Sequence, residues 1–177
     1  IYLKLENQQI TGSFKIRGAI NAISNLNPAQ KKAGVVALST GNHGRGLAFA
    51  AKLMNIRCII CMSKLVPSNK IEGIKALGAE VRLIGANQDE AQLEADRLSI
   101  EEGMTYISPF DNIDVIAGQG TLGLEIHRQI PELNFAFVPL SGGGLICGVA
   151  KALKGLNRNL KVIGVSMDRG AAMYESQ

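Results

Sequence analysis

The sequence predicts an α/β protein built on open parallel sheets, and two observations lead to that prediction. Short apolar runs alternate with amphipathic stretches along most of the chain, which is the order of strands and helices in β-α-β units. Helical crossovers make the strands of such units parallel and cover both faces of the sheet. A composition with 46% hydrophobic residues, 19% charged residues and 20 glycines is that of a globular chain.

A small domain is expected over residues 34–110, where this alternation is continuous. Val35–Leu38 is short and rich in β-branched residues, as buried strands are, and the next stretch repeats apolar residues at helical spacing. Glycine follows two of the expected helices, at Gly78 and Gly103, where it ends a helix with little strain. The expected strands cover residues 35–38, 56–62, 80–84 and 106–107, and the expected helices 43–54, 68–77 and 88–102.

The residues on either side, 1–33 and 111–177, are assigned to a larger domain. The expected elements are a helix over 114–130, a strand over 135–140, a helix over 145–153 and a strand over 162–165. Ile1–Leu5 is expected to be a strand. Because a parallel strand needs neighbours and covering helices, the large domain is expected to be incomplete in this chain.

Charge and cysteine usage argue against several classes of function. The net charge is +4 and the lysines and arginines are scattered, so nucleic-acid binding is not expected. The apolar runs are too short for a membrane span, and three cysteines without a framework indicate a reducing cytoplasm. Cys58 and Cys61 form a C-x-x-C, but residues three apart on a strand point to opposite faces. A shared metal or redox role is therefore not expected for them.

Residues Ser141–Leu145 form a glycine-rich turn between an expected strand and an expected helix. In this geometry, backbone N–H groups and a helix N-terminus face an anion. The turn has neither the G-x-G-x-x-G pattern of dinucleotide sites nor the Gly-Lys-Ser/Thr of a Walker A motif. Taken alone, it is compatible with a phosphate site and with a purely structural turn.

A second loop, Ser39–Gly44, also joins a strand to a helix, and a lysine stands near the start of the chain. The hydroxyls, the Asn42 amide and the N–H groups of this loop could bind a carboxylate or a phenolate, although His43 could equally be a polar cap. Lys15 follows Phe14, which could pack against a ring. A lysine must be neutral to form a Schiff base, and partial desolvation lowers its pKa in that direction.

Together these motifs resemble those of the fold-type-II pyridoxal phosphate enzymes, which have the tryptophan synthase beta-like fold. The branch they resemble most comprises threonine/serine dehydratases and serine racemases. The resemblance covers essentially the whole chain and implies two open parallel-sheet domains, a small amino-acid substrate and, for the full-length protein, a homo-oligomer (dimer or tetramer). The matching segments are Ser13–Ala19, Ser39–Gly44, Gly78–Val81, Ile116–Thr121 and Ser141–Leu145.

The resemblance implies a role for each matching residue. Lys15 would hold pyridoxal 5'-phosphate as a Schiff base and later remove the Cα proton of the substrate. Phe14 would lie against the pyridine ring, and Asn42 would bond its phenolic oxygen. The phosphate would be bound by Gly142, Gly143, Gly144 and Leu145, and the substrate carboxylate by Ser39, Thr40, Gly41, Asn42 and His43.

Departures from the family patterns narrow the expected activity. Thr40 stands where racemases usually have a serine and dehydratases an alanine, and Phe110 stands where racemases tend to have an asparagine. Ser166 replaces the glutamate of metal-activated members, so no metal site is expected. The segment 166–173 is similar to dehydratases of hydroxyectoine utilisation.

The expected function is a threonine/serine dehydratase, an ammonia-lyase that eliminates water from a β-hydroxy amino acid to give a 2-oxo acid and ammonia. Two alternatives share the fold, a serine racemase and a hydroxyectoine-pathway dehydratase. A third, from another class, is a non-catalytic phosphate-binding α/β module.

Overall fold

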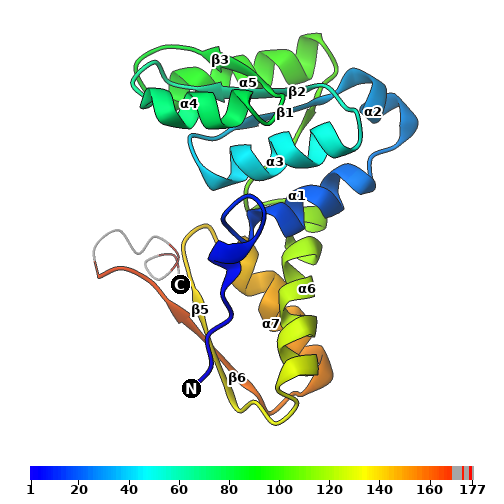
Figure 1. The fold of residues 1–177 in the computed structure, drawn as a ribbon, viewed down its shortest axis with the longest axis vertical. Helices are drawn as coiled ribbons and strands as arrows, with labels where there is room; N and C mark the ends of the chain where they lie inside the picture. The colour runs from blue at the N-terminus through cyan, green and yellow to red at the C-terminus, as the bar shows by residue number, and fades with distance from the viewer. Residues whose placement is uncertain (169–172, 174–175, 177) are drawn as a thin grey trace.

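The structure, a computed structural model, describes residues 1–168, 173 and 176 and contains two parallel sheets (Figure 1). Sheet A has the strand order β3-β2-β1-β4, and sheet B pairs β5 with β6. The α/β class with parallel sheets is therefore confirmed. The strands are β1 (Val35–Leu38), β2 (Cys58–Met62), β3 (Glu80–Leu83), β4 (Thr105–Tyr106), β5 (Phe135–Pro139) and β6 (Lys161–Val165).

The helices expected from the periodicity all occur, with no end shifted by more than three residues. Two helices near the N-terminus, α1 and α2, were not assigned from the sequence. No helix in the described part of the chain is long and apolar enough to cross a membrane. The helices are η1 (Glu6–Gln8, 3-10), α1 (Lys15–Ser24), α2 (Pro28–Ala33), α3 (Asn42–Leu53), α4 (Ser68–Lys75), α5 (Gln88–Glu101), α6 (Ile113–Gln129) and α7 (Gly144–Leu156).

Helices cover both faces of sheet A. Because side chains alternate along a strand, each strand contributes residues to both faces. Cys58 and Ile60 pack into the cluster that includes α1 and α3, whereas Ile59 and Cys61 pack with α5 on the other face. The two cysteines therefore lie on opposite faces, as predicted. Burial raises the pKa of Cys58 to about 12 and that of Cys61 to about 11, so neither is a thiolate at neutral pH.

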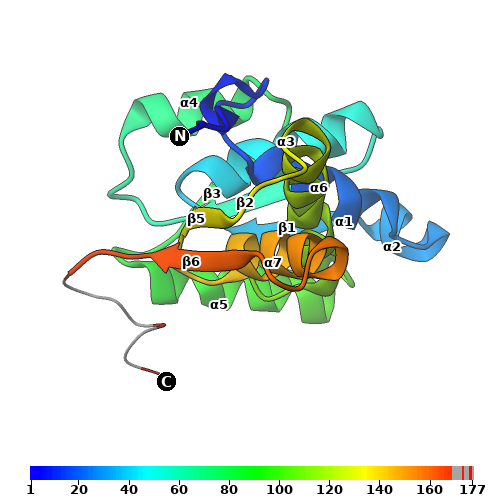
Figure 2. The same ribbon diagram turned by 90° about the horizontal axis from the view of Figure 1, so that it is seen from below.

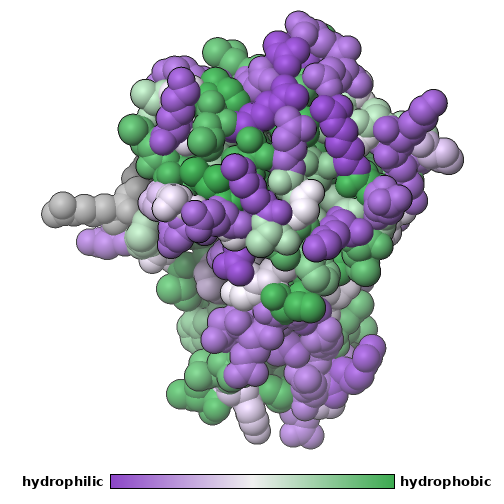
Figure 3. Space-filling view, turned by 45° about the horizontal axis from the view of Figure 1, so that its top comes forward, coloured by the Kyte–Doolittle hydropathy of each residue, from purple (hydrophilic) through white to green (hydrophobic). Residues whose placement is uncertain are grey.

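Sheet B is covered on one face only among the described residues. Helix α7 lies beside the two strands (Figure 2), and Ala136 and Val138 of β5 pack against residues of α7 and α6. The alternate residues Phe135 and Phe137 are 49% and 68% exposed. Hydrophobic residues accordingly reach the surface along the margin of the lower part of the molecule in Figure 3. Because parallel strands are normally buried on both faces, this bare face agrees with the expected incomplete large domain.

The expectation of a strand at Ile1–Leu5 is wrong, because this segment has no regular secondary structure. No described strand pairs with its backbone. The segment is held instead by the side chain of Lys4, whose Nζ lies 2.8 Å from a carboxylate oxygen of Glu125 and 3.1 Å from Oε1 of Gln129. An apolar pattern alone does not make a strand when no partner supplies backbone hydrogen bonds.

Helix α1 packs against both α3 and α6 and lies between the two sheets (Figure 1). Its contact with α6 is close, since a Cβ on Gly18 would come within 2.8 Å of Val115. Lys15 is the first residue of this helix. The position of α1 therefore carries the candidate lysine to the junction of the two sheets, while the domain boundary at residues 33/34 stays a prediction.

Candidate active site

The order of strands in sheet A indicates where a ligand binds. The chain builds β1, β2 and β3 in one direction across the sheet and then places β4 on the opposite side of β1. In open α/β sheets, ligands bind outside the carboxyl ends of the strands at such a reversal. Here the reversal lies between β1 and β4, which lead into the loops Ser39–Gly41 and Ile107–Asn112.

Lys15 lies at this junction and contacts the loop that follows β4. Its Nζ donates a hydrogen bond to the carbonyl oxygen of Pro109 at 2.7 Å and lies 5.3 Å from the centre of the Phe14 ring. Burial lowers the pKa of the Lys15 ammonium below its usual value of 10.5. Burial therefore shifts Lys15 toward the neutral amine, the form that Schiff-base formation requires.

The loop after β1 is shaped by Ser39 and opens helix α3. Ser39 Oγ accepts hydrogen bonds from the N–H groups of Gly44 at 2.9 Å and Gly41 at 3.3 Å. The N-cap residue of helix α3, Gly41, has no side chain, and as the first helical residues Asn42 and His43 have no intrahelical acceptor for their N–H groups. These groups are available to a carboxylate.

A cavity of about 250 Å³ adjoins this loop. Among the described residues, two cationic side chains and no acidic one line it, so its surroundings favour an anion. Asn42 itself is exposed. The lining residues are Thr40, Gly41, Asn42, Arg45, Asn69, Lys70, Gly73 and Ile74.

The ring of His43 is buried and used internally. It is 4% exposed, and its Nε2 lies 2.8 Å from the carbonyl oxygen of Ile107. Burial, opposed by this hydrogen bond and aided by the nearby Lys15 charge, lowers the pKa of His43 to about 4. A neutral imidazole must donate from Nε2 to a carbonyl, so the ring holds the loop after β4 and leaves only the backbone N–H of His43 for a substrate carboxylate.

We expect His43 to make the protein less stable as the pH falls from 6.5 to 4. In that window the unfolded histidine gains a proton that the folded one, with its pKa of about 4, does not accept. Linkage gives a loss of about 2 kcal/mol between pH 7.5 and 5. In urea unfolding of the full-length protein, His43→Gln should lose correspondingly less over this interval. An identical pH dependence in the two proteins would contradict the burial of a neutral ring.

The glycine turn has the geometry of an anion cradle. Gly143, the residue before α7, has a φ of +86°, which favours glycine. A Cβ on Gly142 would lie 2.6 Å from the Phe110 ring, and one on Gly144 would lie 2.8 Å from Phe110 Cα. Helix α7 begins without a side-chain cap, so its first N–H groups are open to a phosphate. The residues present thus fit the phosphate end of the expected cofactor.

The segment Ile107–Phe110 connects the three motifs. Pro109 contacts Lys15, Ile107 contacts His43, and Phe110 packs on the glycine turn. Sequence reasoning noticed only Phe110. It missed Ile107 and Pro109 because they act through backbone carbonyls, which no residue type reveals. The one available signal was the short strand before them, at the point where strand order reverses.

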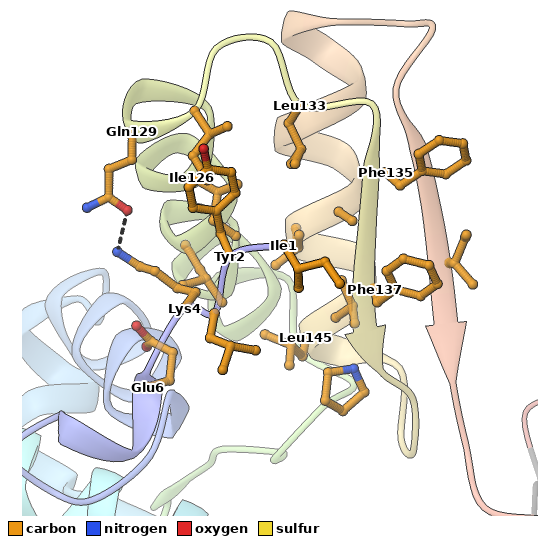
Figure 4. Close-up of a pocket in the computed structure, with 18 of the residues that line it drawn as sticks. Ile1, Tyr2, Lys4, Glu6, Ile126, Gln129, Leu133, Phe135, Phe137 and Leu145 are labelled. Carbon is orange, nitrogen blue, oxygen red and sulfur yellow. Dashed lines mark hydrogen bonds between the residues drawn. The ribbon is translucent and has the colours of Figure 1, made fainter.

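Other predicted residues lie along a hydrophobic groove of about 930 Å³ (Figure 4). Phe14 and Leu145 line it, together with the bare face of β5 and the N-terminal segment. No described contact joins Leu145 or Asn42 to Lys15. In the described part of the chain no three His, Cys, Asp or Glu side chains are placed to hold a metal. Residues 169–172 of the hydroxyectoine-like segment 166–173 lie outside the described residues.

Comparison with known proteins identifies the family. The family profile described as "Pyridoxal-phosphate dependent enzyme" matches residues 1–177. The chain belongs to this family. The resemblance drawn from the motifs, the fold-type-II class and the pyridoxal phosphate cofactor are thereby confirmed.

Within the pyridoxal-phosphate dependent enzymes, the chain is 55% identical to a protein of Sinorhizobium fredii named "Putative threonine dehydratase", over 99% of this chain and 53% of that protein. It superimposes on threonine deaminase isoform 2 from Solanum lycopersicum with a TM-score of 0.96 at 44% identity, covering 99% of this chain and 51% of that one. Serine racemase from Dictyostelium discoideum gives a TM-score of 0.93 at 38% identity, covering 97% and 56%. The chain thus spans about half the length of these relatives.

Proposed function

We propose that this chain carries the catalytic lysine, the phosphate cradle and the carboxylate site of a threonine/serine dehydratase. The reaction would eliminate water from a β-hydroxy amino acid and yield a 2-oxo acid and ammonia. The observation that carries the proposal is the position of Lys15, half-buried at the reversal of strand order with a lowered pKa. The threonine dehydratase and threonine deaminase names of the relatives support the same reaction.

When bound, pyridoxal phosphate supplies an electron sink for the carbanion formed at the substrate Cα. The chain supplies the base and its orientation. A neutral Lys15 amine accepts the Cα proton, and the resulting ammonium donates to the Pro109 carbonyl, which is 2.7 Å away. This acceptor keeps the proton-bearing nitrogen in one place between steps.

The remaining residues bind and orient. The N–H groups of Gly142–Leu145 would hold the phosphate, Phe14 would pack on the ring, and the Asn42 amide would bond the phenolic oxygen. The substrate carboxylate lies on Ser39–His43, where uncapped N–H groups and the charges of Arg45 and Lys70 attract it. A homo-oligomer, dimer or tetramer, and a cytoplasmic location are proposed with this function.

The second candidate is a serine racemase, supported by the likeness to the Dictyostelium enzyme and by the Thr40 hydroxyl on the cavity wall. Elimination is favoured because the β-branched Thr40 has few rotamers for proton transfer. Incubating the full-length protein with L-serine should give pyruvate at least about tenfold faster than D-serine. Thr40→Ala should keep elimination and lose any residual racemisation. D-serine as the main product would overturn the dehydratase assignment.

The non-catalytic alternative, a phosphate-binding module, predicts a different result. Its binding of pyridoxal phosphate would be reversible and would leave no label on Lys15 after borohydride reduction. The dehydratase predicts a visible absorbance band, its loss on reduction, and a reduced adduct on the peptide that contains Lys15. Peptide mapping of the reduced protein decides between the two.

A further inference from the structure

Arg17, two residues after Lys15, has all five of its N–H groups engaged. Its Nε and Nη2 donate to the two oxygens of Glu6 at 2.7 and 2.9 Å. Its Nη1 and Nη2 donate to the two oxygens of Glu125 at 2.7 and 2.8 Å. The remaining Nη1 hydrogen is directed at Thr121 Oγ1, 3.1 Å away. Two bidentate carboxylates thus hold one guanidinium in a single orientation.

The network is partly buried, and its charges balance. The side chains of Arg17 and Glu6 are 11% and 14% exposed, whereas those of Lys4 and Glu125 are 27% and 38% exposed. Lys4 adds a second cation 2.8 Å from Glu125 and donates to Gln129 (Figure 4). The guanidinium, followed by Lys4, lowers the pKa of Glu125 to about 2. Two cations therefore face two anions.

Fold stability alone does not account for this network. Ion pairs add little net stability in either setting, because desolvation offsets the attraction of buried pairs and solvent screens the exposed ones. The close packing of Gly18 and Gly118 at the crossing of α1 and α6 already joins the two helices. What the network adds is a defined orientation of the first turn of α1 relative to α6 and to the N-terminal segment.

The backbone of that first turn packs closely on α3, since a Cβ on Gly46 would lie 3.1 Å from the carbonyl carbon of Lys15, but its other polar contacts are weak. Helix α1 has no capping side chain, and the nearest polar contact to the Lys15 N–H is Ser13 Oγ at 3.4 Å. A helix is stiff and rises about 1.5 Å per residue, so a shift at Arg17 moves Lys15 with it. Displacement of a reacting group by about 1 Å can cost about 100-fold in rate.

We propose that Arg17 is a positioning residue for Lys15, acting through Glu6 and Glu125 to set the height and rotation of the lysine at the site. The inference rests on the proposed function for its catalytic consequence. It also predicts a property of Lys15 itself, the rate at which its amine captures pyridoxal phosphate.

The test uses the full-length protein and the variant Arg17→Lys, which keeps the charge and loses the bidentate fork. We expect pyridoxal phosphate to attach to Lys15 of the apoprotein about tenfold more slowly, measured by borohydride trapping and peptide mapping. With L-threonine, kcat should fall about tenfold or more while KM stays within about threefold. The melting temperature should change little.

The matched control is Arg97→Lys on α5, because Arg97 also pairs with two carboxylates, Glu94 and Glu101, but on an exposed surface. It should alter neither attachment nor kcat. Glu125→Gln keeps one acceptor oxygen and should slow attachment of pyridoxal phosphate to Lys15 about threefold. This variant tests the same positioning role if Arg17→Lys does not fold. A lower melting temperature with unchanged attachment and kcat would reduce the network to a structural ion pair. If the wild-type protein attached pyridoxal phosphate to Lys15 but did not turn over L-threonine, the proposed function would instead be refuted.

Discussion

Replacing Lys15 with alanine in the full-length protein is expected to abolish covalent attachment of pyridoxal phosphate and to reduce elimination from L-threonine by about 10⁴-fold. The amine is both the attachment point and the proposed acceptor of the Cα proton, and alanine can serve as neither. Its ammonium is the group held 2.7 Å from the Pro109 carbonyl with a lowered pKa. Borohydride trapping and 2-oxobutanoate formation measure the two effects.

Lys31→Ala is the control, since Lys31 lies exposed on α2. It should keep both the adduct and the turnover. If Lys15→Ala retained a borohydride-stable adduct at another lysine together with activity, the assignment of the catalytic residue would be wrong.

Gly148→Ala is expected to destabilise the full-length protein by about 3 kcal/mol, through overpacking at the crossing of α6 and α7. The added Cβ would clash with the carbonyl oxygen of Ile116 and lie 2.7 Å from the backbone nitrogen of Gly120. These are backbone atoms of α6, so relief requires the two helices to separate. The shift in urea unfolding midpoint measures the loss.

Gly155→Ala provides a matched control on the same helix, because a Cβ there meets no heavy atom within 4 Å. It should stabilise α7 by about 0.5–1 kcal/mol, since alanine is the better helix former. Equal effects of the two substitutions would show that the close helix crossing does not form.

The pattern of strands and helices could be predicted from the sequence because it depends on residues close together along the chain. Periodicity located β1, α3 and the later elements to within three residues. The same reasoning failed at Ile1–Leu5, where an apolar pattern predicted a strand but no neighbouring strand pairs with it. It also left α1 unassigned, although that helix brings Lys15 to the junction of the sheets.

Within the candidate site, the sequence by itself determined the chemistry of the parts. A lysine beside Phe14, a polar strand-to-helix loop and a glycine turn are each ambiguous alone, and in combination they indicate a phosphorylated cofactor. Only the tertiary structure decided how these parts meet. Ile107 and Pro109 contribute carbonyl groups that every residue type carries, and burial makes the ring of His43 an internal support, so that only its backbone N–H is left for a carboxylate.

The same distinction applies to Arg17, whose charge is evident from the sequence but whose partner Glu125 lies on another helix 108 residues away. Side-chain type and local spacing specify which groups a chain offers and which elements it forms. Desolvation, backbone contacts and long-range ion pairs depend on which elements pack together. The pKa and the orientation of a side chain are set by the groups that surround it in space, and these are not its neighbours in sequence.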